Sequence, residues 1–197
     1  SPGGGINVSG VFSDSGDFNP EAGQTLLNST GASDVFILQF NATGTFQWAV
    51  NAGSGYGVYG AQIVTTSTGA IYQTNSTEVS LSGEPYEDIS IRKFSSGGTL
   101  LWSKHIGGNF MDQASGITTD EDENLYISGD FGSESVDFDP GSGETILQCN
   151  GMESINGYLV KFTPAGNLEW VTPFSGNPNA MRDIKYHSGF VYTTGCF

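Results

Sequence analysis

Three copies of the pattern Phe-x3-Gly-x3-Trp constrain this chain more than any other feature of its sequence. All three tryptophans of the chain lie in these copies. The same spacing three times around the rarest kind of residue indicates a repeat protein. The copies are Phe40-Gly44-Trp48, Phe94-Gly98-Trp102 and Phe162-Gly166-Trp170.

The residues around each copy predict a unit of four strands, which we name A, B, C and D in chain order. Each Phe ends strand C, and each Trp lies in strand D after a short turn. The Gly of the pattern falls in that turn, where a positive φ is easily adopted. Strand A is expected at 61–66, 115–119 and 183–187, strand B at 6–12, 71–75, 125–131 and 191–197, strand C at 34–40, 88–94 and 156–162, and strand D at 45–50, 99–106 and 167–174.

The composition supports an all-β fold built from these units. Glycine accounts for 29 of 197 residues, and short β-branched and aromatic runs are bounded by Gly, Ser, Asn and Asp. Four short antiparallel strands per unit are typical of a β-propeller blade. Blades cover both faces of each sheet, which explains the nearly continuous apolar residues of strand C. We expect each Trp ring to fill space between neighbouring blades.

The expected organisation is an irregular lead-in at 1–5 and propeller repeats over 6–197. The repeats divide into units at approximately 6–52, 60–107, 113–175 and 181–197. About three blades plus a partial one are fewer than the ~4–8 of an ordinary ring. The sequence therefore predicts a part of a larger propeller or one protomer of an assembly.

The repeat resembles the bacterial β-propeller repeat called SBBP. The resemblance rests on Gly129-Asp130-Phe131, followed by Asp137-Phe138-Asp139-Pro140-Gly141, and covers essentially the whole chain after residue 5. The second unit departs from it, because Asn75 replaces the Gly and the Asp-Phe-Asp-Pro segment is missing. The resemblance implies a secreted or cell-surface bacterial protein and no particular reaction.

The charge of the chain excludes some classes of partner. Its net charge is −15, with 21 acidic and 6 basic residues. A phosphate backbone or an anionic membrane surface would be repelled by this charge. The longest apolar runs, such as Val35–Leu38, are too short to span a bilayer. We expect no nucleic-acid binding and no membrane insertion.

A second repeat inside the long B–C connections is the best candidate for a binding site. Asp17-Phe-Asn19-Pro matches Asp137-Phe-Asp139-Pro, and each is followed by a Gly and a Thr at the same spacing. Alternate Asp and Asn oxygens near a tight turn can ligate calcium. The alternative is an Asx-Pro turn that directs an extra strand, at 25–27 and 145–147, onto the blade.

The two cysteines, Cys149 and Cys196, form no CxxC motif. Cys149 lies in a B–C connection, and Cys196 lies at the end of strand B in the next unit. Strand B exits toward the face that bears these connections, so a disulfide across neighbouring blades is one interpretation.

The leading functional hypothesis is a non-catalytic scaffold that binds a protein or glycan. The B–C connections (11–33, 76–87 and 130–155) are variable loops on a rigid framework, where recognition usually lies. A structural component or cargo of a bacterial surface or secretion assembly is the alternative. A hydrolase or lyase would need reactive residues on strand A, and only the copy beginning at Asp183 is chemically rich. No catalytic or cofactor-binding residue is predicted.

Overall fold

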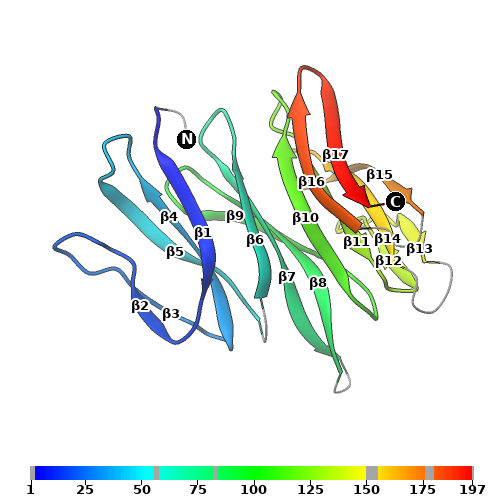
Figure 1. The fold of residues 1–197 in the computed structure, drawn as a ribbon, viewed down its shortest axis with the longest axis horizontal. Coiled ribbons are helices and arrows are strands. Elements are labelled where there is room, and N and C mark those ends of the chain that lie inside the picture. The colour runs from blue at the N-terminus through cyan, green and yellow to red at the C-terminus, as the bar shows by residue number, and fades with distance from the viewer. Residues whose placement is uncertain (1–2, 56–57, 82–83, 150–154, 176–179, 197) are drawn as a thin grey trace. The chain divides into compact units, whose positions relative to one another are not determined.

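The computed structural model describes residues 3–55, 58–81, 84–149, 155–175 and 180–196. Every regular element in these ranges is a β-strand, and all of the pairings between strands are antiparallel (Figure 1). The chain divides into two compact units, which we describe separately. Unit 1 comprises Ser1–Glu78 and Ile91–Ser103, and unit 2 comprises Val79–Ser90 and Lys104–Phe197.

The first sheet lies in unit 1 and holds strands B, C and D of the first repeat. Its order is β1-β4-β5. Strand D, predicted at 45–50, extends further in the structure and ends at Gly55. A bulge between Val35 and Phe36 lets the ladder continue to Gly55. The strands are β1 (Ile6–Phe12), β4 (Ser33–Phe40) and β5 (Phe46–Gly55).

The second sheet has the order β6-β7-β8-β9, which is A-B-C-D as the sequence predicts. The loop expected at 76–87 is wrong, because strands B and C both extend into it. This connection lacks the Asp-Phe-Asx-Pro segment that ends pairing in the other copies, and its residues 82 and 83 lie outside the described ranges. The strands are β6 (Val58–Thr65), β7 (Ile71–Leu81), β8 (Glu84–Phe94) and β9 (Leu100–Ile106).

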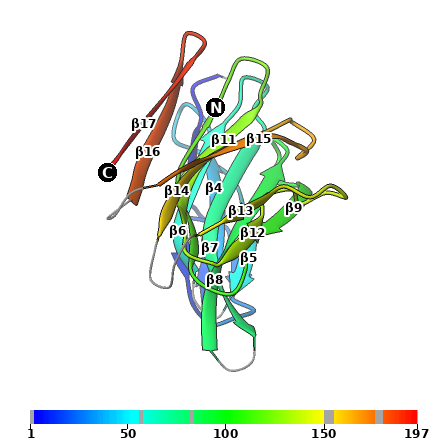
Figure 2. The same cartoon turned by 90° about the vertical axis from the view of Figure 1, so that its right-hand side faces the viewer.

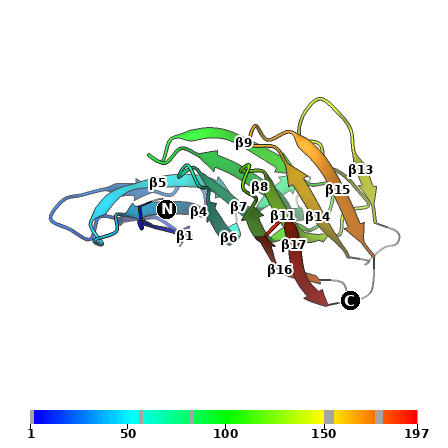
Figure 3. The same cartoon turned by 90° about the horizontal axis from the view of Figure 1, so that it is seen from above.

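Unit 2 contains the complete third blade, in the order β10-β11-β14-β15, and the two-stranded sheet β16-β17. Strands β11, β14 and β15 run side by side in Figure 3. Strand β17 pairs with β16 (Figure 2). The strands are β10 (Asp112–Thr119), β11 (Leu125–Phe131), β14 (Asn156–Phe162), β15 (Leu168–Phe174), β16 (Ala180–His187) and β17 (Phe190–Cys196).

The turns between strands C and D have the predicted geometry. Gly44, Gly98 and Gly166 have φ values of 82°, 79° and 81°. Each glycine N–H donates to the carbonyl three residues earlier, at 2.9–3.0 Å. The glycine of the repeated pattern is therefore fixed by the backbone of the turn, because a side chain there would be strained.

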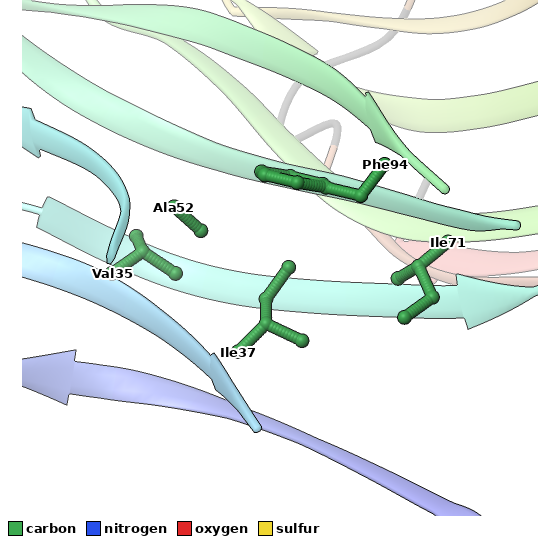
Figure 4. Packing of buried hydrophobic residues seen from close by; sticks show 5 residues of the cluster. All are labelled: Val35, Ile37, Ala52, Ile71 and Phe94. Carbon is green, nitrogen blue, oxygen red and sulfur yellow. The ribbon is translucent and has the colours of Figure 1, made fainter. Parts of the chain in front are cut away.

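The core of unit 1 lies between its first sheet and strands of the second. Val35, Ile37, Ala52, Ile71 and Phe94 are buried against one another (Figure 4). The ring of Trp48 packs against this cluster and against the next C–D turn, where a Cβ on Gly98 would lie 2.9 Å from the indole. The expectation that a Trp fills space between neighbouring blades is confirmed for this copy.

The core of unit 2 is rich in aromatic rings. Phe131, Phe138 and Tyr158 are fully buried, with centroids 5.7 Å apart for the first two and 4.9 Å apart for the last two. On the other face of the blade, Tyr126 stacks on Tyr186 of β16 at 6.1 Å. Both faces of this sheet are therefore covered, as a propeller blade requires.

Candidate functional site

The two long B–C connections each fold into a short hairpin. The predicted extra strands are present, one residue later than expected, but each pairs within its own hairpin instead of joining the blade. Figure 1 shows the first hairpin beside the blade of unit 1. The hairpins are β2 (Ser15–Asp17) with β3 (Leu26–Asn28), and β12 (Ser135–Asp137) with β13 (Ile146–Gln148).

One aspartate closes each hairpin. The Asp17 carboxylate accepts hydrogen bonds from the backbone N–H groups of Asn19 (3.1 Å) and Thr25 (2.9 Å). In the second hairpin Asp137 accepts from the N–H groups two and eight residues later, at 2.9 and 2.8 Å. The hydrogen bond from Thr25, and then that from Asn19, lowers the pKa of Asp17. A single carboxylate thus holds both ends of the loop together.

The second Asx of each motif orders the loop tip. Asn19 accepts from the N–H of Glu21 at 2.9 Å, and Asp139 accepts from the N–H of Gly141 at 2.8 Å. A Cβ on Gly143 would lie 2.2 Å from the Asp139 carboxylate, so a side chain at this position would displace that carboxylate. In the first hairpin the corresponding distance, from Gly23 to the Asn19 amide, is 2.8 Å.

These bonds bear on the two interpretations of the motif. Asp17, Asn19, Asp137 and Asp139 all accept backbone hydrogen bonds, which is what an Asx-Pro turn requires. Among the described residues, no group of three or more His, Cys, Asp or Glu side chains is placed to hold a metal. The turn interpretation is therefore the one with direct support, and calcium binding stays a prediction.

An aromatic side chain fastens each hairpin to its blade. Phe18 and Phe138, which follow the closing aspartates, insert between one residue from strand B and one from strand C. Such ring pairs stabilise beyond the apolar area that they bury. The centroid distances are 5.1 Å for Phe18–Phe12, 4.8 Å for Phe18–Phe36, 5.7 Å for Phe138–Phe131 and 4.9 Å for Phe138–Tyr158.

The base of the first hairpin is held by Asp34, a fully buried residue of β4. Its carboxylate accepts from the N–H groups of Thr30 (2.9 Å) and Gly31 (3.2 Å), and from the side chains of Ser29 and Asn51. Burial acts to raise the pKa of Asp34, but these donors outweigh it and the pKa lies below its usual value. The charged form of Asp34 is the one that the site stabilises.

The base of the second hairpin uses a different pair at the aligned positions. Cys149 stands where the first hairpin has Ser29, and Asn156 stands where it has Asp34. The Asn156 amide donates to the Cys149 sulfur at 3.4 Å. No disulfide joins Cys149, which is buried, to Cys196, which is exposed, so the predicted bridge is not formed in this structure.

A buried aspartate on strand A completes the second base. Asp112 accepts from the N–H groups of Gly108 (2.9 Å) and Gly132 (3.2 Å) and from the Ser133 hydroxyl (2.7 Å). Burial raises its pKa despite these bonds. Burial, together with the charge of Asp112, raises the pKa of Asp88 to about 6. Asp88 stands at the position of β8 that corresponds to Asp34 of β4. Strands β7 and β8 continue beyond this point, whereas the first blade has a loop there whose N–H groups donate to Asp34.

Each hairpin also exposes an aliphatic side chain. Leu26 is 59% exposed and the aligned Ile146 is 44% exposed. The same hairpins carry exposed acidic residues, including Asp14 and Glu21 in the first and Glu144 in the second. A preformed, acidic loop with an apolar centre is therefore present twice, once in each unit.

Asp183, which begins the chemically rich copy of strand A, lies on the surface, and so do both histidines. Asp183 is exposed on β16, and its carboxylate accepts from the N–H of Ile184 at 2.8 Å. His187 is exposed at the end of the same strand. His105 lies in β9, with Nδ1 3.0 Å from the Ser90 hydroxyl. Asp183 and His187 therefore lie on β16, and His105 lies on β9.

Sequence reasoning missed the buried aspartates. The first residue of strand C is Asp34 in the first copy, Asp88 in the second and Asn156 in the third. A polar residue repeated at this position was the sequence signal that could have identified them. Asp112 gave no comparable signal, because its partners at 132 and 133 are about twenty residues away.

The described residues contain no helix long and apolar enough to cross a membrane. No family model matches the chain. The chain is similar to an uncharacterized WD repeat-containing protein of Acanthamoeba polyphaga mimivirus, with 24% identity over 183 residues. The match covers 83% of this chain and 13% of that protein. WD repeats are four-stranded propeller blades, and this likeness agrees with the sheets described above. The likeness does not test the SBBP resemblance, which stays a prediction.

Proposed function

We propose that the chain is a non-catalytic β-propeller scaffold that binds a protein partner through the hairpins β2–β3 and β12–β13. The observation that carries this proposal is the duplicated hairpin itself. Its loop is closed by Asp17 or Asp137, and it displays Leu26 or Ile146 to solvent. A loop that is ordered before binding loses less conformational entropy when a partner binds.

The chemistry of the hairpins favours a basic protein surface over a glycan. Their exposed centres are aliphatic, and aliphatic contacts surrounded by charge are typical of protein interfaces. The surrounding acids and the net charge of −15 attract a basic partner and increase the rate of encounter. The similarity to a WD repeat-containing protein supports a propeller scaffold and names no partner.

The SBBP resemblance supports an extracellular or cell-surface location in a bacterium. The alternative, a structural component or cargo of a bacterial surface or secretion assembly, would have the same cellular location. Membership of a larger propeller or assembly is part of both proposals.

A selection experiment tests the role of the hairpins. A displayed random-peptide library is selected on the intact chain, and the selected peptides are measured on Leu26→Asp/Ile146→Asp. We expect enriched basic and apolar peptides that bind the double variant at least tenfold more weakly. Leu101→Asp is the matched control, because Leu101 is 54% exposed on β9. Equal binding to the double variant and the wild type would contradict the proposal. Binding of a glycan array, lost in the same variant, would identify a glycan partner instead.

A further inference from the structure

We propose that the buried guanidinium of Arg92, on β8, binds a small molecule that carries a single carboxylate group. This inference is independent of the function proposed for the B–C hairpins, because it concerns the second repeat, whose B–C connection lacks the Asp-Phe-Asx-Pro segment. Arg92 is only 8% exposed, and it lies in unit 1 together with the residues that contact it. A guanidinium stays charged in proteins, so its burial requires a compensating group.

Arg92 and Gln73 occupy a position across strands C and B that is apolar in the other two repeats. Arg92 Nη1 donates to Gln73 Oε1 at 3.1 Å, and Gln73 is fully buried. Burying these two side chains carries a desolvation cost that two apolar side chains would avoid. A buried charge that the other repeats do without indicates a role other than packing. The apolar pairs at the aligned positions are Val8–Leu38 and Ile127–Val160.

A network of side-chain amides fixes the orientation of the guanidinium. Nη1 of Arg92 also donates to Asn75 Oδ1 at 2.8 Å. The Gln73 amide donates to the same oxygen at 2.9 Å, and the Asn75 amide donates to the Thr77 hydroxyl at 2.7 Å. The amides therefore use these donors inside the network, and their oxygens hold one corner of the guanidinium in place.

The backbone of β5 leaves space for the guanidinium. Gly53 has a φ of 133°, and a Cβ on it would lie 2.3 Å from both Cζ and Nη2 of Arg92. Any other residue at this position would be strained and would push the guanidinium away. The guanidinium therefore occupies the place that a side chain at position 53 would fill.

The described residues supply Arg92 with no carboxylate. Within the described ranges its side-chain hydrogen bonds go to the neutral oxygens of Gln73 and Asn75, and both come from Nη1. The two salt bridges found in these ranges both involve Lys161. Burial lowers the pKa of Arg92. The donors left for a ligand are Nε and Nη2, which form one edge of the planar group.

The chemistry of this edge fits a carboxylate. Two parallel N–H groups of a guanidinium match the two oxygens of a carboxylate and form charge-assisted hydrogen bonds with them. One positive charge is balanced by one negative charge, and the net charge of −15 disfavours anions that carry more. The small exposed area of Arg92 favours a small ligand over an acidic side chain on another protein. The ligand class is therefore a small monocarboxylate, and formate is the simplest probe.

Nuclear magnetic resonance of the intact chain, labelled with nitrogen-15 in arginine, tests the site directly. The chain has two arginines, and the other one, Arg182, is exposed on β16 and serves as an internal control. Formate replaces chloride at constant ionic strength while the Nε–H signals are followed. We expect a saturable shift of the Arg92 signal, with a Kd of about 1 mM or weaker for so small a ligand. The Arg182 signal should show no saturable shift.

Variants separate recognition of the carboxylate from simple attraction of charge. Formate should raise the Tm of the wild type. Arg92→Lys keeps the charge and loses the planar edge, so it should need at least about tenfold more formate for the same rise. Arg92→Leu/Gln73→Ile restores the apolar pair of the other repeats and should abolish the response. Arg182→Leu removes an exposed charge and should respond as the wild type does.

Circular dichroism checks that each variant keeps the β-sheet fold before its response is compared. The proposal is overturned if the Arg92 signal shows no saturable shift when formate replaces chloride, or if both arginine signals shift alike. It is also overturned if Arg92→Lys and the wild type respond equally to formate, because the planar edge would then play no part.

Discussion

The two B–C hairpins are alike at the tip and different at the base. At the tip, Asp17 and Asp137 accept the same pair of backbone hydrogen bonds at nearly equal distances. At the base, a serine hydroxyl lies 3.2 Å from the Asp34 carboxylate in one copy, and the Asn156 amide donates to a cysteine sulfur in the other. The tip must satisfy a fixed backbone geometry, whereas the base tolerates new residues if both partners change together.

The bases also differ in charge. The Asp34 carboxylate accepts hydrogen bonds from several donors, and its pKa is lowered. Asp112 has a raised pKa and lies near Asp88. The second base therefore brings two carboxylates close together, and like charges in a buried site favour protonation. The two hairpins should respond differently to substitution and to pH.

The largest effect is expected at the base of the first hairpin. Asp34→Ala leaves the N–H groups of Thr30 and Gly31 without their acceptor and should lower the free energy of unfolding by about 3 kcal/mol. Urea unfolding monitored by circular dichroism measures the change. Asp14→Asn is the control, because Asp14 is exposed and Asn tolerates its positive φ of 60°. Equal stabilities of the two variants would show that Asp34 does not hold the base.

A smaller effect is expected from transplanting one base into the other hairpin. Asp34→Asn should cost about 2 kcal/mol, and adding Ser29→Cys should recover about 1 kcal/mol, because the new amide then has the partner that Asn156 has. A double-mutant cycle in urea measures the coupling. If the coupling is zero, the two bases are not exchangeable pairs.

The third effect is a pH dependence that comes from Asp88 in unit 2. Asp88 has a pKa of about 6 in the folded state, above its ordinary 3.8, so the folded state binds the proton more tightly. The contribution of Asp88 to the free energy of unfolding is therefore most favourable below about pH 4 and is lost as the pH rises through about 6. Because Asp88 is half-buried, the screened effect is about 1 kcal/mol. Asp88→Asn should stabilise the protein by that amount at pH 8 and leave it unchanged at pH 4. Equal stabilisation at both values would contradict the raised pKa.

The smallest effect is expected at the loop tips. Gly143→Ala places a methyl group against the Asp139 carboxylate and should cost about 0.5 kcal/mol, the lower end of the value of one lost hydrogen bond. Gly23→Ala should cost less, because its contact with Asn19 is longer. Thermal unfolding of the two variants compares them directly, and a larger cost for Gly23→Ala would show that the closeness of the Cβ contact does not set the cost.

The sequence predicts the parts of the fold that depend on local chemistry. The positive φ of Gly44, Gly98 and Gly166 follows from turns of a few residues, and so do the Asx-Pro turns at Asp17 and Asp137. The repeat period then orders the strands correctly as A-B-C-D.

The remaining features depend on contacts between distant residues. Asp112 reaches Ser133, twenty-one positions away, and Asp34 on β4 reaches Asn51 on the neighbouring strand β5. The length of β7 and β8 depends on the absence of a loop motif in that connection. The disulfide was predicted from chain direction alone, whereas Cys149 packs at the hairpin base beside Asn156.

The central claim is that the two hairpins are preformed on their blades. Residue-resolved amide hydrogen exchange of Thr25 and Thr145 tests it most directly, because these N–H groups donate to Asp17 and Asp137. We predict that both amides are protected, to a similar degree and well above the open-chain rate. Exchange of both at the open-chain rate would contradict the claim, because the loops would then order only when a partner binds.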